Sequence, residues 1–538
     1  MAIISRQFEE LDSSILTSEE VALLNFSHSD APVKRLESPC FAGPSYNVEK
    51  CKSVTASWGN STLHISDPTS MMSLLFQGRT CEPPSISPAS NQTCTSGGSP
   101  AYAINASRIA DIQLGVNFAR RSGIRLVIKN TGHDFSGKSG GADALSIWTH
   151  HLKGMEFVPE FRGEGKKGYN GPAFKCRSGI QAWEIYEAAS KQGLVVVGGE
   201  GRTVGVMGGY ILGGGHSPLS SIHGLGADHI ISLDIVLSSG RFITATPTKN
   251  YDIYWARAGG GGSTLGVVTS VTVKAHPDFP VTAFSFSFSA SSTAVLWAGV
   301  RSFFNYFIPL SEAGTYSYFN VFPGVIPTFS MKPYFAPNLT IVQTEALLKP
   351  WFDDLAALGI FIAAKLAAYP NYLRAWQANF PQEGAGGDTS IVGSRLFPRS
   401  NWLNETLLNA TFTAWKESVD ADLFTISFNF GPTLAAGGDP DNSVNPAWRE
   451  SVMHAMQLVL WPSDANYTEI KQKRDLLTER QNAWIEVSPG AGAYLGESDR
   501  EDVDFQQNFY GKNYARSLRI KHEIDPEDVF LGEDYCRK

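Results

Sequence analysis

The chain has 538 residues, which is too long for one ordinary hydrophobic core, so two or more domains are expected. A formal net charge of −8 and the lack of a long Lys/Arg run exclude a nucleic-acid-binding protein from the expected classes. The most apolar stretch, residues 355–368, is interrupted by Lys365, so we predict a buried helix there and no membrane span.

Residues 1–99 are predicted to form an extended N-terminal segment with one helix at 18–26 and a cysteine cluster. The clustered cysteines lie in Pro/Ser/Gly-rich sequence that crosslinks would stabilise; they are Cys40, Cys51, Cys81 and Cys94. One or two disulfides are expected. The sequence does not choose among the three pairings, although Cys40–Cys51 and Cys81–Cys94 are the shortest closures. Metal binding is the alternative, but no CxxC or His spacing supports it. Cys176 and Cys536 are expected to stay outside these pairs.

Eight N-x-S/T sequons occur along the chain, which is a high density for a cytosolic enzyme. Their asparagines are Asn25, Asn60, Asn91, Asn105, Asn338, Asn404, Asn409 and Asn466. We therefore expect a secretory-pathway or extracellular protein whose signal peptide is absent from this sequence, because residues 1–10 contain no apolar region of that kind. The alternative is that polar loops produce sequons by chance.

From residue 100 onward, a strand at 101–104, a helix at 109–122 and a strand at 124–128 predict a β-α-β unit. The second strand leads into residues 129–141, Lys-Asn-Thr-Gly-His-Asp-Phe-Ser-Gly-Lys-Ser-Gly-Gly. Turn residues of these types expose successive backbone N–H groups that can surround phosphate oxygens, and His133 adds a nucleophilic imidazole. The loop therefore predicts an anion-binding site.

A second glycine-rich segment, residues 198–216, follows a predicted strand at 173–178, a helix at 180–193 and a strand at 194–197. Omitting so many Cβ atoms permits close approach of a pyrophosphate and a flat ring, whereas a flexible turn is the alternative for one such loop. The segment does not follow the Rossmann pattern. That pattern has a single G-x-G-x-x-G motif and, about 20 positions beyond it, an acidic residue that binds the ribose, and no such pair is found here. A nicotinamide-dependent dehydrogenase is therefore disfavoured.

A third glycine-rich string lies within residues 252–269, where an aromatic-rich helix precedes four glycines and the strand Leu-Gly-Val-Val-Thr. Before it, Gly-Leu-Gly-Ala-Asp at 224–228 leads into predicted strands at 230–237 and 241–245. Three such segments in one half of the chain favour a bound ligand over flexible turns.

Beyond Pro277 the pattern changes, and residues 278–280 are interpreted as a linker. The strands are predicted at 282–289, 314–322, 327–335 and 421–430, and the helices at 293–307, 341–368 (one helix, or two that meet at 349–350) and 467–484. This pattern indicates an α+β domain with an antiparallel sheet. Within 421–430, Thr425, Ser427 and Asn429 share one face, which a plain sheet would expose to solvent.

The three glycine-rich strings, in this order over about residues 98–275, resemble the FAD-linked oxidases of the vanillyl-alcohol-oxidase and berberine-bridge-enzyme type. The strings at 493–499, 509–518 and 524–530 resemble the berberine-bridge ending. The resemblance implies an α+β fold with a two-part FAD-binding domain (PCMH type) and a substrate domain of antiparallel sheet plus helices. The implied segments are 1–99 packing on the FAD domain, 100–276 binding FAD, 277–484 binding substrate and 485–538 returning to the FAD domain. The polar face of 421–430 would then cover the isoalloxazine.

In that family a histidine at the position of His133 bonds to the 8α-methyl of the flavin, so covalent FAD through His133 is implied. Many berberine-bridge relatives add a link through a cysteine before Pro-Thr-Val-Gly. Gly201 stands at that position here, so no cysteinyl link is expected. The residues assigned to the cofactor are Asn130, Thr131, Gly132, His133, Asp134, Ser136, Gly137, Ser139, Thr203, Val204, Gly205, Gly208, Gly209, Gly213, Gly214, Gly215, His216, Gly224, Asp228, Val268, Tyr510 and Asn513. No metal site is expected.

The catalytic residues are expected to be Tyr494 and Tyr510. Four candidates for a base, namely Tyr494, Tyr510, Glu497 and His216, stay open, and Tyr494 is preferred if its surroundings lower its pKa. Each has a structural alternative, because a tyrosine can simply pack, a glutamate can lie at the surface and a histidine can bind a phosphate or a carbonyl. The family usually carries Asn where this chain has Gly496, so no role is assigned there.

Three functions remain open. An FAD-dependent oxidase would take a hydride from an alcohol, amine or N-methyl carbon of a small organic substrate, such as a natural product, and reduce O2 to H2O2. A non-redox cyclase of natural-product biosynthesis would use FAD as a structural group, and a binding or storage protein would hold an inactive flavin. An oligosaccharide oxidase is disfavoured, because relatives that accept bulky sugars often carry two flavin links. The expected partners are a small molecule and O2, and the expected state is a monomer.

Overall fold

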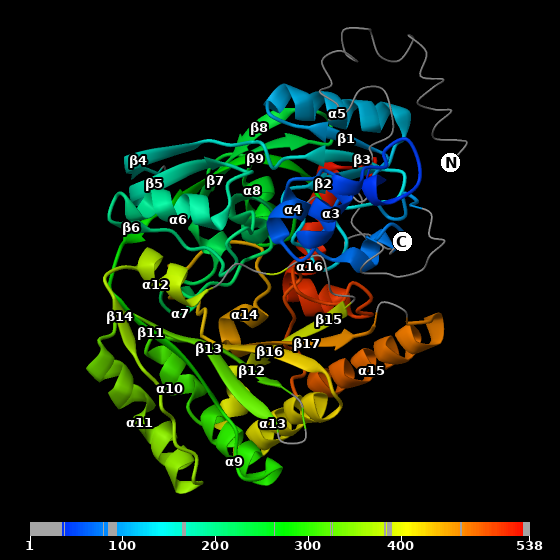
Figure 1. Ribbon diagram of the computed structural model, residues 1–538. Helices are drawn as coiled ribbons and strands as arrows, with labels where there is room; N and C mark the ends of the chain where they lie inside the picture. Colours follow the sequence, from blue (N-terminus) through cyan, green and yellow to red (C-terminus); the bar gives the residue numbers. More distant parts are fainter. Residues whose placement is uncertain are drawn as a thin grey trace.

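The structure is a computed structural model of the 538-residue chain, drawn in Figure 1. It describes residues 35–36, 38–78, 80–83, 94–163, 168–262, 264–322, 324, 327–380, 384, 390–462 and 465–530. The predicted helix at 18–26, the sequons at Asn25 and Asn91, and Cys536 lie outside the described residues.

A three-stranded parallel sheet carries the first glycine-rich loop. Its order is β1 (Tyr102–Asn105), β3 (Leu145–Trp148) and β2 (Leu126–Lys129), and α5 (Ile109–Ser122) connects β1 to β2. The helix ends at Gly123, whose φ of 61° is left-handed. The predicted β-α-β unit is confirmed, with β3 inserted between its two strands, and the 129–141 loop begins where β2 ends.

A five-stranded antiparallel sheet follows in the order β4-β5-β9-β7-β8. Its strands are β4 (Met155–Arg162), β5 (Asn170–Arg177), β7 (Ile230–Leu237), β8 (Phe242–Ala245) and β9 (Gly266–Lys274). Its connections contain α6 (Ala182–Ser190), β6 (Leu194–Val195), η3 (Val206–Tyr210), α7 (Ser220–His223), η4 (Gly226–His229) and α8 (Tyr251–Arg257). The two later glycine-rich segments are therefore connections within this sheet.

The second half of the chain builds a seven-stranded antiparallel sheet in the order β14-β11-β13-β12-β16-β17-β15. Its strands are β11 (Val281–Phe288), β12 (Tyr316–Phe322), β13 (Thr328–Pro337), β14 (Ala367–Tyr369), β15 (Ser390–Pro398), β16 (Phe424–Asn429) and β17 (Ser451–Leu460). Helices cover its lower face in Figure 1; they are α9 (Thr293–Phe304), α10 (Phe307–Glu312), α11 (Ile341–Ala357), α13 (Glu405–Asp420) and α15 (Tyr467–Glu486). The predicted α+β class is confirmed.

Large aromatic side chains fill the space between this sheet and its helices. Trp351 of α11 stacks on Phe303 of α9, and Trp415 of α13 packs against Phe304. All four side chains are fully buried. This core leaves the opposite face of the sheet turned toward the first half of the chain (Figure 1).

The polar face of β16 was predicted to cover the flavin, and this prediction is wrong. Thr425, Ser427 and Asn429 are fully buried, and Ser427 and Asn429 bond toward the helical layer. Ser427 Oγ accepts a hydrogen bond from Trp415 Nε1 at 3.0 Å, and Asn429 Nδ2 donates to the backbone oxygen of Phe307 at 3.1 Å. Ser427 and the amide nitrogen of Asn429 therefore find partners inside the core, while the apolar residues of the strand face the other side.

The predicted helix over 341–368 is too long. α11 continues through Pro350 and ends at Ala357, after which Gly359 takes a φ of 76° that favours glycine. The next element, β14, begins at Ala367. Among the helices that the structure describes, none is long and apolar enough to cross a membrane.

Two disulfides hold the N-terminal segment, Cys40–Cys51 and Cys81–Cys94, which are the two shortest closures. Cys176 is buried and unpaired, as expected. The short helices here are η1 (Ser38–Cys40), α3 (Val48–Ala56), α4 (Ser61–Ile65) and η2 (Leu74–Gln77).

The C-terminal segment packs against the first half of the chain. Its elements are η6 (Gln506–Tyr510), η7 (Gly511–Asn513) and α16 (Tyr514–Ile524). α16 contacts α8, and Phe530 lies in the same apolar core as Ile104 and Leu145. The remaining elements are β10 (His276–Pro277), α12 (Tyr372–Asn379), η5 (Arg399–Leu403) and α14 (Ala447–Glu450). The division into four segments at 99, 276 and 484 stays a prediction.

Candidate FAD site

A cavity of about 390 Å³ lies where the loop after β2, the 199–216 segment and the inner face of the seven-stranded sheet meet. One wall is rich in glycine, with Gly199, Gly201, Gly205, Gly208, Gly209 and Gly262. The opposite wall is apolar, with Tyr318, Ile426, Phe428 and Met456 from β12, β16 and β17. A wall of exposed backbone facing an apolar wall suits a flat ring with an organic molecule beside it.

Two charged side chains fix the 129–139 loop. The Asp134 carboxylate accepts hydrogen bonds from the backbone N–H groups of Lys138 at 2.6 Å and Ser139 at 3.0 Å. Lys129 Nζ donates to the backbone oxygens of His64 at 3.2 Å and Asp67 at 2.7 Å, and burial lowers the pKa of Lys129 to about 7. Lys129 thus ties the loop to the N-terminal segment.

His133 lies in the wall of the cavity and links two glycine-rich segments. Its Nε2 atom is 2.7 Å from the Oγ1 atom of Thr203. This hydrogen bond orients the imidazole ring. Gly201, which lies two residues before Thr203, also lines the cavity and has no side chain that could bond to a flavin.

Asn130, in the first glycine-rich loop, packs against the second segment. Its Nδ2 atom donates to Thr149 Oγ1 at 3.1 Å and to the backbone oxygen of Ser178 at 2.7 Å. A Cβ atom at Gly205 would lie 2.2 Å from Asn130 Oδ1, and one at Gly208 would lie 2.6 Å from Nδ2. Both positions therefore require glycine, so part of the glycine pattern serves loop packing.

Of the residues assigned to the cofactor from the sequence, most line this cavity. They are Asn130, Thr131, Gly132, His133, Asp134, Ser136, Ser139, Val204, Gly205, Gly208, Gly209, His216 and Val268. The others lie outside its lining: Gly137, Thr203, Gly213, Gly214, Gly215, Gly224, Asp228, Tyr510 and Asn513. Their assignment to the cofactor stays a prediction.

Asp228 has a full set of protein partners away from the cavity. Its carboxylate accepts hydrogen bonds from Arg449 at 2.7 and 2.8 Å, from Asn442 at 2.7 Å and from the backbone N–H of Leu225 at 2.8 Å. Asn513 likewise donates to the backbone oxygen of Val444 at 3.0 Å. Asp228 thus joins η4 to α14, across the two halves of the chain.

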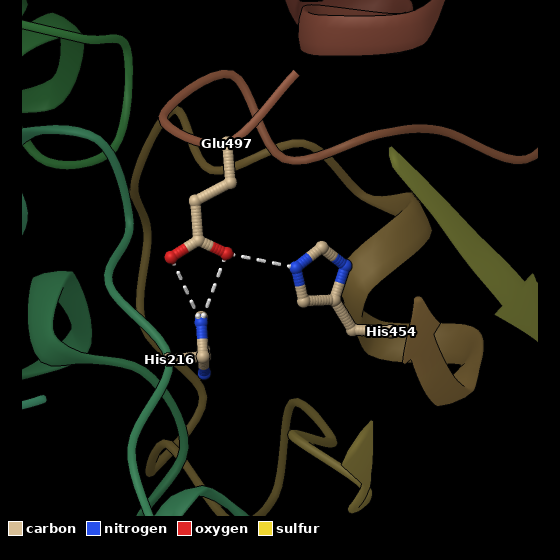
Figure 2. A group of neighbouring side chains, drawn as sticks. All are labelled: His216, His454 and Glu497. Carbon is tan, nitrogen blue, oxygen red and sulfur yellow. Dashed lines mark hydrogen bonds and ion pairs between the residues drawn. The ribbon is translucent and has the colours of Figure 1, made fainter. Parts of the chain in front are cut away.

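A charged cluster borders the cavity on the side of the seven-stranded sheet. Glu497 Oε2 lies 3.2 Å from His216 Nε2 and 3.0 Å from His454 Nε2 (Figure 2). Burial by itself raises the pKa of Glu497, but the charge of His216 and the hydrogen bonds from both histidines hold it far below its ordinary value. Burial by itself lowers the pKa of His216, and the Glu497 carboxylate raises it above its ordinary value, whereas burial lowers the pKa of His454. The carboxylate is therefore ionised at neutral pH.

Tyr494 and Glu200 complete this end of the cavity. Burial, followed by the charge of Glu497, raises the pKa of Tyr494 above its ordinary value. The phenol therefore stays protonated at neutral pH and can donate a hydrogen bond, which differs from the base expected from the sequence. Burial also raises the pKa of Glu200 to about 8.

Several functional residues were missed by the sequence analysis. Glu200 is the only acidic residue in the 198–216 segment, and a charge among glycines was the available signal. His454, Tyr318 and Met456 come from strands without a motif, so no sequence signal identified them. Phe428 was placed on the wrong side of its strand by the assignment of the polar face.

The residues present fit a polar, flat cofactor. Buried side-chain atoms of lining residues that have no hydrogen-bond partner in the part of the chain that the structure describes include Asn130 Oδ1, Ser178 Oγ, Glu200 Oε1 and His216 Nδ1. Buried polar groups are almost always bonded, so these atoms point to a ligand with hydrogen-bonding edges. Together with the glycine wall and His133, they fit FAD.

Comparison with known proteins identifies the family. Residues 100–246 match the family model described as FAD binding domain, and residues 466–533 match the model described as Berberine and berberine like. FAD-linked oxidoreductase ZEB1 of Gibberella zeae is 35% identical over 96% of this chain and 89% of its own length. The chain belongs to the FAD-linked oxidoreductases of the vanillyl-alcohol-oxidase and berberine-bridge type.

Other relatives agree with this assignment. Bifunctional decalin synthase calF of Penicillium decumbens is 33% identical over 92% of this chain and 86% of its own length. The crystal structure of the VAO-type flavoprotein MtVAO615 from Myceliophthora thermophila C1 superposes with a TM-score of 0.88 at 31% identity, covering 97% of this chain and 95% of that one. The protein is thus an FAD-dependent oxidoreductase that acts on a small molecule.

Proposed function

We propose that this FAD-linked oxidoreductase is an oxidase whose flavin is attached through His133 alone. It takes a hydride from an alcohol, amine or N-methyl carbon of a small organic substrate and reduces O2 to H2O2. The observation that carries the proposal is the position of His133, in the cavity wall and hydrogen-bonded to Thr203. Gly201 supports the single link, because it offers no thiol.

The residues around the cavity take distinct roles in this proposal. FAD, when bound, accepts the hydride and passes the electrons to O2. The 130–139 loop and Gly205 would hold the cofactor, while Tyr318, Phe428 and Met456 would exclude water and position the substrate carbon. Tyr494 would donate a hydrogen bond to a substrate heteroatom. Tyr510 stays a predicted catalytic residue without a place in the cavity lining.

Anaerobic mixing with a panel of alcohols, amines and N-methyl compounds tests the proposal. An oxidase bleaches its flavin absorbance with at least one member of the panel and recovers it with formation of H2O2 when O2 is admitted. Turnover of a compound without any bleaching would contradict the proposal. A His133→Ala variant that still carries covalent flavin would contradict the attachment.

A cyclase is the second candidate, because the relative calF is named a bifunctional decalin synthase. The apolar wall of Ile426, Phe428 and Met456 could fold an apolar chain without any electron transfer. In that case an isomerised product forms while the flavin stays oxidised, so the anaerobic experiment separates the two functions.

We also propose passage through the secretory pathway. Both disulfides need an oxidising compartment, and five sequon asparagines are exposed, namely Asn60, Asn338, Asn404, Asn409 and Asn466. Removal of N-glycans from the secreted protein is expected to lower its apparent mass. An unchanged mass, with free thiols at Cys40 and Cys81, would contradict this.

A further inference from the structure

Three side chains from distant parts of the chain converge beside the FAD cavity. His216 follows the second glycine-rich segment, His454 lies on β17 and Glu497 belongs to the C-terminal segment (Figure 2). Each points one ligand-type atom at the same small volume, and these atoms all lie within 4.8 Å of one another. No metal site was expected from the sequence, in which the three residues lie more than forty positions from one another.

The geometry is close to that of a tetrahedral metal site. Zinc bound to imidazole nitrogen and carboxylate oxygen has bond lengths of about 2.0–2.2 Å, which places neighbouring ligand atoms roughly 3.4 Å apart. The Glu497 Oε2 atom is 3.2 Å from His216 Nε2 and 3.0 Å from His454 Nε2. All three ligand-type atoms lie within 4.8 Å of one another, so side-chain shifts of about 1 Å would place an ion between them.

The charges around the cluster favour a divalent cation. Glu497 is one carboxylate, and Glu200 is a second that interacts electrostatically with both His216 and Glu497. The ionised Glu497 carboxylate offers a negative charge to a cation, and each histidine binds a metal ion in its neutral form.

We propose that His216, His454 and Glu497 bind one divalent transition-metal ion, with Zn²⁺ as the best-fitting ion. Two histidines with one glutamate and an open fourth position form a ligand set that proteins use for Zn²⁺. His216 and Glu497 line the cavity and His454 lies behind them, so the fourth position faces the cavity. It takes an oxygen donor, either water or a hydroxyl or carbonyl group of a small molecule. The site does not depend on the proposed oxidase activity.

Metal analysis of the purified, flavin-loaded protein tests this site. The protein is stripped with a chelator, dialysed against Zn²⁺ and analysed by mass spectrometry of the metal, and its affinity is measured by competition with a chromogenic chelator. One Zn²⁺ per chain is expected for the wild type. His454→Ala and Glu497→Gln are expected to weaken binding by about 100-fold or more. His522→Ala, on the exposed surface of α16, is the matched control and is expected to bind like the wild type.

A second measurement guards against variants that fail to fold. Anomalous scattering at the zinc edge from wild-type crystals is expected to show a peak between the three side chains. The proposal is overturned if saturating Zn²⁺ leaves no peak there, or if folded His454→Ala and Glu497→Gln proteins bind Zn²⁺ as tightly as the wild type. In either case the cluster is a hydrogen-bonded ion pair only.

Discussion

The Nε2 atom of His133 lies 2.7 Å from the Oγ1 atom of Thr203, so a single hydrogen bond joins the first glycine-rich loop to the second. His133 lines the cavity, whereas Thr203 stands just behind the lining and is buried. Thr203 thus orients His133, the side chain proposed to attach the flavin. The same segment carries Gly201 at the position of the family's second attachment residue. In the proposed attachment, the 198–216 segment therefore orients His133 through Thr203 and offers no cysteine at position 201.

Thr203→Val is expected to reduce flavin attachment, because it removes the hydroxyl group that orients the His133 ring. A hydrogen bond of this kind contributes about 1 kcal/mol, so attachment is expected to slow several-fold. The measurement is the fraction of flavin that stays with acid-precipitated protein. Thr203→Ser keeps the hydroxyl group and is expected to match the wild type, and equal attachment in the Val and wild-type proteins would exclude this role.

Tyr494→Phe distinguishes a hydrogen-bond donor from a base. Because burial raises the pKa of Tyr494, its phenol is protonated throughout the accessible pH range. With a substrate found in the anaerobic panel, the variant is expected to reduce its flavin roughly 10- to 100-fold more slowly, with the same pH profile as the wild type from pH 6 to 9. Loss of a titration from that profile would instead identify Tyr494 as the base.

The Asp228–Arg449 ion pair is expected to stabilise the contact between the two halves of the chain. Asp228 is fully buried and the Arg449 side chain is 11% exposed. Asp228→Asn leaves Arg449 charged and uncompensated, so the free energy of unfolding is expected to fall by about 3–5 kcal/mol. The measurement is denaturant unfolding. The Asp228→Asn/Arg449→Met double variant is expected to recover part of this loss, and additive losses would show that the pair is not coupled.

A histidine cluster at the junction of the two halves is expected to make stability depend on pH. His229 Nε2 donates to the backbone oxygen of His223 at 2.7 Å, so its Nδ1 atom accepts from His276 Nε2 at 3.1 Å. Burial lowers the pKa values of His223, His229 and His276 to about 4, 3 and 2. The unfolded chain therefore binds more protons below pH 6.5, and the free energy of unfolding falls as the pH decreases from 6.5 toward 4.

His276→Gln keeps an N–H donor toward His229 and removes one protonation site. The difference in the free energy of unfolding between pH 7 and pH 5 is expected to shrink by about 2 kcal/mol. The measurement is denaturant unfolding at the two pH values. The control is His522→Gln at the exposed surface, where no change is expected. An unchanged difference in the His276→Gln protein would refute the assignment.

The sequence was most informative where a function constrains the backbone. The 129–141 and 198–216 segments were identified because glycines and turn residues are needed wherever a chain approaches another group closely, as Gly205 and Gly208 approach Asn130. The alternation in β16 correctly separated its two faces. It could not tell which face meets the helices, because both faces are buried.

Contacts between distant segments could not be predicted from the sequence. Asp228 was assigned to the cofactor from its neighbouring glycines, but its partners Arg449 and Asn442 lie more than two hundred positions away. His454 was not identified, because one histidine in an apolar strand has no local signature. Its role depends on His216 and Glu497, which only the folded chain brings beside it.

The central claim is an FAD cofactor attached through His133 alone, and peptide mass analysis of the purified protein tests it most directly. We expect the peptide that contains His133 to carry the mass of FAD and the peptide that contains Gly201 to be unmodified. An unmodified His133 peptide from yellow protein, or an FAD adduct on the Gly201 peptide, would contradict it.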